Sequence, residues 1–341
     1  MKQMKRLTKQ QTKRIIMRSL PVLPLAAIAF ISLPSLLPES EKEMRQSVAM
    51  VECRQYYEIT DGRKTLAVAS DIAADTTLYR PSAKKDSDTE QLAATSGCWI
   101  NKYPLMPSCH GRLLISQPFE GDDKLLAYAN SNIQELIART ITSLEKEKEC
   151  YRKRRSELDY YLNTHSVKDE GYNSIAAYAN SEKEKRNKLD STISLLQELS
   201  ANTGRLKIIR HTTYTLLAAH EKSIAKTACI PLSDESKEYG NGCIVVQTAD
   251  RHTPDNASPL YRHRLLSPSM EKGDSITVAA IFGLNPKSDK SKVRQGAKTF
   301  RGVMTSPKKH DIPTLLAPDG SPLFSSRGYF IGINRKGEVA R

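Results

Sequence analysis

The chain has 341 residues and a formal net charge of +14, from 52 basic and 38 acidic side chains. Seven of the basic residues lie within the first eighteen positions, which contain no acidic residue, so the rest of the chain carries only about +7. No basic stretch is interleaved with aromatic residues, which argues against a nucleic-acid partner. The six cysteines lack the spacing of metal ligands, and we expect neither a metal nor a cofactor.

The beginning of the chain has the pattern of a membrane anchor. Residues 1–18 form a basic segment, residues 19–38 are uncharged and mostly apolar, and acidic residues follow at once. Since about 20 apolar residues span a bilayer core as a helix, this run is just long enough. The charge pattern predicts a single-pass protein with a cytoplasmic N-terminus and the bulk of the chain in the periplasm or otherwise outside the cytoplasm. A cleaved signal peptide is the alternative, and it too exports the protein.

A first β-rich segment is predicted at residues 39–118. Short apolar runs stand at 47–52 and 97–101, and a third run, 107–116, contains His110. A lone histidine beside an apolar strand is usually structural, so His110 has no functional meaning when it is taken by itself. All six cysteines lie beyond the anchor, where disulfides can persist, and the sequence does not choose among their pairings.

Residues 119–226 are predicted to form a helical insertion. Glycine is scarce there, proline is absent, and apolar side chains recur at the i, i+3, i+4 spacing of one helix face. Breaks at 165–172 and 202–204 divide the segment into two long helices and a third, more apolar stretch at 206–225. Two long helices joined by one short turn should pack antiparallel, as a coiled-coil hairpin. Such an arm either binds partners or further copies of the chain, or it is a spacer that satisfies its own apolar faces.

The β-rich pattern resumes after the insertion. Residues 227–262 contain an apolar run, Gly242 to Val246, that is followed by the polar sequence Asp255-Asn256-Ala257. By itself this polar sequence is ordinary turn chemistry. Two further apolar runs follow, at 270–284 and 298–306.

The C-terminal stretch reads as a hairpin of two apolar strands. A Pro-Asp-Gly turn leads into Gly320-Ser-Pro-Leu-Phe324, a second turn ends at Gly328, and the run Phe330-Ile-Gly-Ile-Asn334 follows. This sequence resembles the nucleophile segment of trypsin-like serine proteases, most closely that of the bacterial high-temperature-requirement (Deg) branch. The runs at 97–101 and up to His110, and those at 242–257, 270–284 and 298–306, resemble earlier segments of the same family, in the same order.

The resemblance implies a mainly β fold with a large α insertion. It would be a trypsin-like (chymotrypsin-fold) double β-barrel, interrupted by the antiparallel helical hairpin and preceded by the transmembrane helix. The first barrel would take residues 39–118 and 227–262, and the second barrel residues 263–341. Cys98 and Cys109 would then lie on neighbouring strands, where a disulfide is plausible.

The resemblance also assigns roles to single residues. His110 would be the general base, and Asp255 the acid that orients it. The nucleophilic serine falls on Asp319, with Ala317 in place of the family's glycine two positions earlier. An ionised carboxylate cannot be activated as a hydroxyl is, and it places negative charge where an oxyanion must develop. Pro318 has no N–H to donate.

These features predict a membrane-anchored, exported serine protease homologue that is catalytically impaired, a pseudoenzyme. It would bind peptides or partner proteins in the cell envelope, with a homo-oligomer through the helical hairpin as a possible assembly. An active serine endopeptidase with Ser321 as a displaced nucleophile is one alternative. A structural envelope protein that oligomerises through its helical arm is the other.

Overall fold

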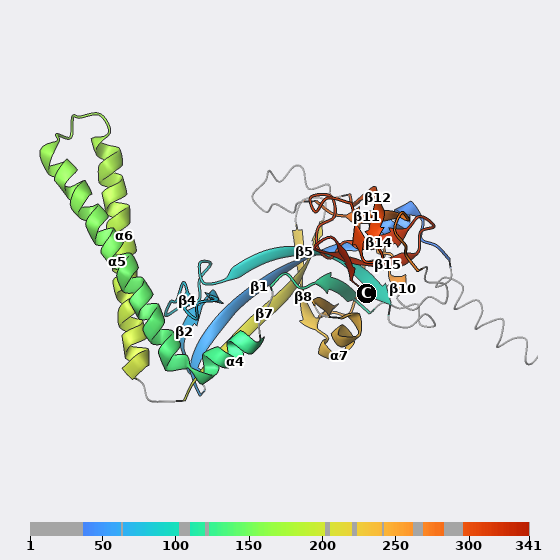
Figure 1. Ribbon diagram of the computed structural model, residues 1–341, viewed down its shortest axis with the longest axis horizontal. Coiled ribbons are helices and arrows are strands. Elements are labelled where there is room, and N and C mark those ends of the chain that lie inside the picture. Colours follow the sequence, from blue (N-terminus) through green and yellow to red (C-terminus); the bar gives the residue numbers. More distant parts are fainter. Residues whose placement is uncertain are drawn as a thin grey trace, which may run out of the picture. The chain divides into compact units, whose positions relative to one another are not determined.

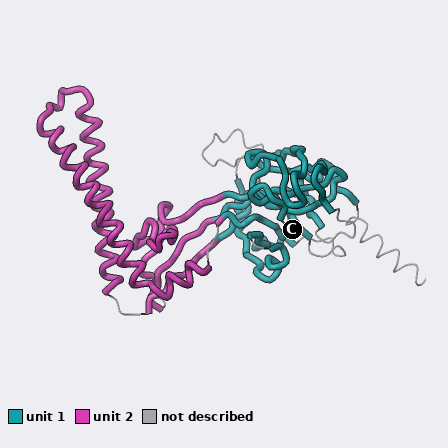
Figure 2. Tube along the Cα trace, viewed as in Figure 1, with its two compact units in different colours: residues 1–53, 94–118, 213–341 teal, residues 54–93, 119–212 magenta. Residues whose placement is uncertain are grey.

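The structure is a computed structural model, which describes residues 37–62, 64–101, 110–119, 123–201, 205–219, 224–240, 242–261, 269–282 and 296–340. The chain divides into two compact units (Figure 2). Unit 1 consists of residues 1–53, 94–118 and 213–341, and unit 2 of residues 54–93 and 119–212. The chain therefore passes from unit 1 to unit 2 and back twice. The second barrel described below lies in unit 1, whereas three strands of the first barrel continue from unit 1 into unit 2.

Six strands close into the first barrel. They are β1 (Val48–Asp61), β5 (Gln91–Asn101), β6 (Arg112–Ser116), β7 (Leu206–Ala219), β8 (Ile224–Pro231) and β9 (Cys243–Thr248). Their order in the sheet is β5-β6-β9-β8-β7-β1, and an additional pairing of β5 with β1 completes the ring. Two more strands extend this sheet: β2 (Lys64–Ala69) pairs antiparallel with β1, and β10 (Leu260–Tyr261) runs parallel to β5.

The second barrel is formed by the C-terminal strands (Figure 1). They are β11 (Ser275–Ala280), β12 (Lys298–Ser306), β13 (Lys309–His310), β14 (Pro322–Ser325), β15 (Phe330–Arg335) and β16 (Glu338–Ala340). The ring runs β11-β12-β13-β16-β15-β14 and closes on β11. In both barrels, strands numbered by their place in the chain follow the order first, second, third, sixth, fifth, fourth. The two barrels thus repeat one topology, and the expectation of a paired-barrel fold is confirmed at this level.

The two barrels share a hydrophobic core. Cys98, Leu114 and Val245 of the first barrel belong to one buried cluster with Phe324 and Ile333 of the second. Phe324 is fully buried, and burial of a phenylalanine side chain stabilises a fold by about 1.5–3 kcal/mol. A second cluster, around Val278 and Leu323, fills the second barrel. The apolar runs of the sequence are therefore the strands that line these cores.

Unit 2 contains the helical hairpin. Its helices are α4 (Asp123–Ser131), α5 (Ile133–Thr164) and α6 (Tyr172–Ala201). The pairs Lys148–Asp190 and Arg155–Ala179 place α5 and α6 antiparallel, as the spacing of apolar residues predicts (Figure 1). The base of the hairpin packs on β1, β2 and the short pair β3 (Asp71–Ile72) and β4 (Leu78–Tyr79). The cluster there is made of Tyr57, Ile59, Leu136, Ile137, Leu196 and other apolar residues.

The helical insertion is shorter than the predicted range of 119–226. The third apolar stretch, at 206–225, contains the long strand β7 and the start of β8 instead of a helix. The segment forms a strand because isoleucine, threonine and tyrosine dominate its residues 207–215. β-branched and aromatic side chains favour the extended chain, where they pack against neighbouring strands. Hydrogen bonds across the sheet, such as Thr60 Oγ1 to the Lys207 carbonyl at 3.3 Å, hold this segment.

The remaining elements are short: α3 (Glu41–Gln46), α7 (Ser233–Ser236) and a 3-10 turn, η1 (Lys237–Tyr239). Helix α3 begins at a capping box, in which the Ser40 hydroxyl and the Glu43 side chain each bond the other's backbone N–H. None of the helices in the described ranges is long and apolar enough to cross a bilayer. The predicted span, residues 19–38, lies outside the described residues except for its last two positions.

Candidate functional site

The loop between β13 and β14 contains the predicted nucleophile position. It turns at Pro318-Asp319-Gly320, where the Ser321 N–H donates to the Pro318 carbonyl at 3.1 Å. Gly320 has a φ of +87°, which favours glycine, and a Cβ atom there would lie 1.8 Å from the Ser96 carbonyl oxygen. The second barrel therefore meets the first at this turn with a contact that only glycine permits.

Asp319 is held from both barrels. Its backbone carbonyl accepts hydrogen bonds from the Ser96 N–H at 3.0 Å and the Thr95 hydroxyl at 3.1 Å, both on β5. Its carboxylate Oδ1 accepts from the Lys336 N–H at 2.7 Å, at the turn between β15 and β16. The Asp319 carboxylate, at the predicted nucleophile position, thus accepts a hydrogen bond from the backbone of the neighbouring turn.

The buried side-chain amide of Asn334 forms hydrogen bonds that stabilise this turn. Asn334 is fully buried, and its Nδ2 donates to the Ala317 carbonyl. Its Oδ1 accepts from the Gly337 N–H at 3.1 Å and lies 2.8 Å from His310 Nε2. Since an amide oxygen only accepts, His310 carries its proton on Nε2. Asn334 therefore joins the 317–321 loop, the β15–β16 turn and His310 in one network.

The backbone N–H groups of Ala317, Gly320 and Ser321 are already bonded within the fold. The Ala317 N–H donates to the Pro313 carbonyl at 3.0 Å, and the Gly320 N–H donates to the Asn334 carbonyl at 2.8 Å. Pro318 has no N–H, and the Ser321 N–H bonds within the turn. An oxyanion hole needs preorganised N–H groups aimed at the reacting oxygen. At positions 317, 318, 320 and 321 this loop offers none.

The structure does not bring His110 and Asp319 together. Thr95, whose hydroxyl bonds the Asp319 carbonyl, also bonds the Ser116 carbonyl at 3.2 Å, so Asp319 lies by the C-terminal end of β6. His110 precedes the N-terminal end of β6, is exposed, and has a φ of +47°. At about 3.3 Å per residue, the strand alone separates the two ends by roughly 13 Å. The residues that follow β6, Gln117 to Phe119, contain no imidazole.

Asp255 lies on the loop after β9, at the same end of the first barrel as His110. The Gly111 N–H donates to the Thr253 hydroxyl at 3.0 Å, which ties the turn after His110 to this loop. Asp255 lines a cleft of about 840 Å³ together with Asp250, His252, Trp99 and other residues of unit 1. Hydrogen bonding, first of all from the His252 N–H, lowers the pKa of Asp250. The predicted acid and base thus share one end of the barrel, away from Asp319.

Ser321 is 0 % exposed, and its hydroxyl has no hydrogen-bond partner among the described residues. A substrate carbonyl could not reach this oxygen without opening the turn. The geometry therefore provides neither a base nor access for a displaced nucleophile at this position.

Sequence reasoning missed Arg335 and Gly242. The Arg335 guanidinium lies where a side chain at position 242 would be: a Cβ there would be 2.0 Å from Cζ. Burial raises the pKa of the neighbouring Cys243, and the charge of Arg335 partly offsets this rise. The contact joins β15 to the start of β9, beside the Gln117 N–H, which donates to the Gly242 carbonyl at 2.8 Å. A glycine and an arginine 93 positions apart give no local signal, so only the structure pairs them.

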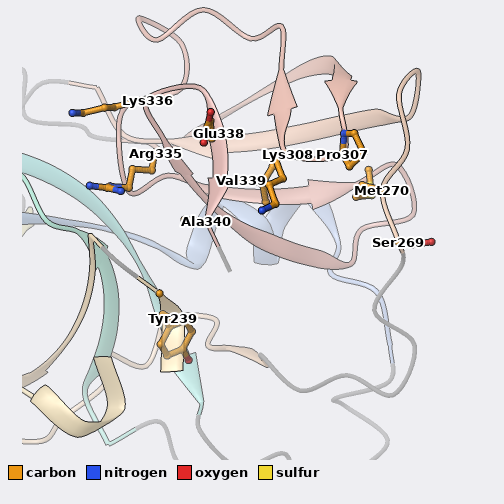
Figure 3. A pocket seen from close by; sticks show the side chains of 11 residues that line it. Tyr239, Ser269, Met270, Pro307, Lys308, Arg335, Lys336, Glu338, Val339 and Ala340 are labelled. Atoms are coloured by element: carbon orange, nitrogen blue, oxygen red, sulfur yellow. The ribbon is translucent and has the colours of Figure 1, made fainter. Parts of the chain in front are cut away.

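Arg335 also lines a cleft of about 770 Å³, which we call the basic cleft (Figure 3). Lys308, Lys336, Glu338, Met270 and Val339 are among its other lining residues. The cleft lies against the second barrel and the loop before β9, with Tyr239 on its far side.

Cys53, Cys229 and Cys243 are buried thiols, and the Cys98 side chain is buried as well. Burial, with smaller contributions from Cys229 and Glu52, raises the pKa of Cys53 to about 12, so this thiol stays protonated and unreactive. Cys109 lies outside the described residues, so its pairing with Cys98 stays a prediction.

No protein-family model matches this chain, and no curated protein matches its sequence.

Proposed function

We propose that this chain is a trypsin-like serine protease homologue of the Deg type that has lost catalysis and binds peptides or partner proteins in the cell envelope. Residues 19–38 would anchor it in the membrane, with the barrels in the periplasm. Two closed barrels of one repeated topology support the family assignment, together with the match of 311–334 to the nucleophile segment. The observation that carries the loss of catalysis is Asp319, a carboxylate at the nucleophile position that is fixed by the Lys336 N–H.

Three further observations support the loss. The N–H groups of Ala317 and Gly320 are used inside the fold, His110 lies at the other end of β6, and Ser321 is buried. Acyl transfer needs a hydroxyl against an imidazole and free donors for the oxyanion. Residue 319 carries no hydroxyl, His110 lies at the other end of β6, and the N–H groups of Ala317 and Gly320 are bonded within the fold.

The test is a casein-cleavage assay with the full-length chain in detergent. We expect no cleavage above a heat-denatured sample of the same protein. The Ser321→Ala variant is the matched control, because the active-peptidase alternative predicts cleavage that this one change abolishes. Cleavage by the wild-type chain that Ser321→Ala or His110→Ala removes would overturn the proposal.

The helical arm favours a second candidate, a structural protein that oligomerises through α5 and α6. Beyond its base the arm leaves Tyr160 at 73 % and Val167 at 65 % exposure around the turn between the helices. Exposed side chains of this kind can serve a protein interface.

A truncated arm separates the two candidates. Deleting residues 147–191 and closing the gap with a short glycine-rich turn leaves Leu136, Ile137 and Leu196 at the base of the hairpin. If the arm oligomerises, the mass in solution should fall from a multiple of the chain mass to that of one chain, as measured by light scattering. A monomer both before and after the deletion would exclude this candidate.

A further inference from the structure

The basic cleft has the size of a ligand site. Its volume is about 770 Å³, within the range of about 300–1,000 Å³ that is usual for small-molecule and peptide-side-chain pockets. It is bounded by the turn between β15 and β16, the turn between β12 and β13, and Tyr239 of the loop before β9. All of these parts belong to unit 1.

The lining of the cleft carries an excess of positive charge. Lys308, Arg335 and Lys336 are cationic, and Glu338 is the one carboxylate among the lining residues that the structure describes. Glu338 already lies 3.1 Å from Lys309 Nζ. Figure 3 shows Arg335 and Lys336 extending to the same side of the β15–β16 hairpin. A ligand that brings carboxylates would complement this charge.

The position of the Arg335 side chain requires a glycine at position 242. Gly242 has a φ of +84°, and a side chain there would overlap the guanidinium, with its Cβ 2.0 Å from Cζ. A half-buried guanidinium has restricted freedom, and its planar fork bonds a carboxylate through two parallel N–H groups. Arg335 is therefore the lining cation best prepared to bind an acidic side chain.

The rest of the lining is apolar. Met270 and Tyr239 are 7 % and 6 % exposed, and Pro307, Val339 and Ala340 lie beside them. An inorganic anion would use the cations and leave this apolar surface unfilled. Nucleic acid would require a longer basic track with exposed aromatic side chains for stacking, and the one aromatic residue in the lining is buried.

We propose that the basic cleft binds an acidic peptide segment, with its carboxylates on Arg335, Lys336 and Lys308 and an apolar side chain against Met270 and Val339. This inference rests on the proposed peptide-binding function and names its ligand class. The backbone of Lys336 also holds Asp319, so the peptide site adjoins the former nucleophile position.

The test is fluorescence anisotropy with the full-length chain in detergent. One probe is a labelled ten-residue peptide that alternates glutamate and leucine, and the other has glutamine in place of glutamate. We expect the glutamate peptide to bind at least about tenfold more tightly, because hydrogen bonds between charged groups are roughly twice as strong as neutral ones. Its affinity should fall further at high ionic strength, since exposed charges are screened.

Two double variants locate the binding. Lys308→Gln with Arg335→Gln should weaken the binding of the glutamate peptide about tenfold or more, since it removes one exposed cation and the guanidinium that can bond a carboxylate through two N–H groups. Lys298→Gln with Arg301→Gln removes the same two kinds of charge from exposed positions on β12 outside the cleft, and should change the affinity less than twofold. Urea unfolding followed by the fluorescence of Trp99 checks that both variants are folded.

Equal affinity of the two peptides, or equal loss in the two double variants, would overturn the inference. So would an oligonucleotide of the same charge that displaces the probe as well as unlabelled glutamate peptide does. These outcomes leave the casein test of lost catalysis untouched. Conversely, casein cleavage would overturn the proposed function while the binding data still stood.

Discussion

Gly320→Ala should destabilise unit 1 by about 3 kcal/mol or more. A new Cβ at position 320 would lie 1.8 Å from the Ser96 carbonyl oxygen, a backbone atom that cannot move aside cheaply. The positive φ adds about 1–2 kcal/mol of strain for a residue with a side chain, and overpacking adds about 1–3 kcal/mol. Trp99 is the only tryptophan of the chain and is buried in the first barrel, so its fluorescence during urea unfolding reports on this unit.

Gly337→Ala is the matched control for this change. Gly337 has a φ of +81°, close to that of Gly320, but a Cβ there meets no atom of the described residues within 4 Å. Gly337→Ala should therefore lower the free energy of unfolding by the backbone strain alone, about 1–2 kcal/mol. If Gly320→Ala lowers the urea midpoint no more than Gly337→Ala does, the close approach of the two barrels at Ser96 is not present.

Asn334→Leu should also destabilise unit 1, by about 3–5 kcal/mol. Leucine fills a similar volume but leaves His310 Nε2, the Gly337 N–H and the Ala317 carbonyl without the bonds that the Asn334 side chain makes. Each buried polar group that loses its partner costs about 1–3 kcal/mol. The measurement is again the free energy of urea unfolding from Trp99 fluorescence.

The exposed Asn256 provides the control, since Asn256→Leu should change the free energy of unfolding by less than about 0.5 kcal/mol. A double-mutant cycle sharpens the test. Because His310 and Asn334 share one hydrogen bond, His310→Leu and Asn334→Leu together should cost at least about 0.5 kcal/mol less than the sum of the two single changes. Strict additivity would mean that the network does not exist.

How far the sequence predicts this fold can be judged from particular segments. The spacing of Leu136, Ile137 and Leu144 on one helix face predicts α5, because one face of that helix is buried at its base. The Pro318-Asp319-Gly320 turn and the two apolar runs after it predict the hairpin of β14 and β15. Both features are local, and local patterns are what a sequence displays directly.

Where the structure differs from the sequence-based prediction, the segment depends on distant partners. Residues 206–225 follow two helices and contain few breaks, a pattern that predicts a continued helical insertion, although Ile208, Ile209 and Thr213 suit a strand. Their strand state is stabilised by β1, some 150 positions earlier in the chain. Propensity is a weak guide where tertiary pairing decides.

The candidate site shows the same division. Asp319 is placed by a local motif, and the structure puts it at the junction of the barrels. His110 could act on residue 319 only if the N-terminal end of β6 lay beside the loop that contains Asp319. The sequence of β6 alone does not show which end of the strand lies there. The pairing of Arg335 with Gly242 and the bond of Thr95 to the Asp319 carbonyl join segments from the two barrels, which no periodicity in the sequence connects.

We propose that the surroundings of position 319, as well as the residue itself, have lost the means of acyl transfer. Fluorophosphonate labelling of an Asp319→Ser variant, read by intact mass, decides whether this is so. Neither the wild-type chain nor Asp319→Ser should gain the mass of one probe, because His110, the predicted base, lies at the other end of β6 and the N–H groups of Ala317 and Gly320 are already bonded. Stoichiometric labelling of Asp319→Ser that His110→Ala abolishes would contradict it.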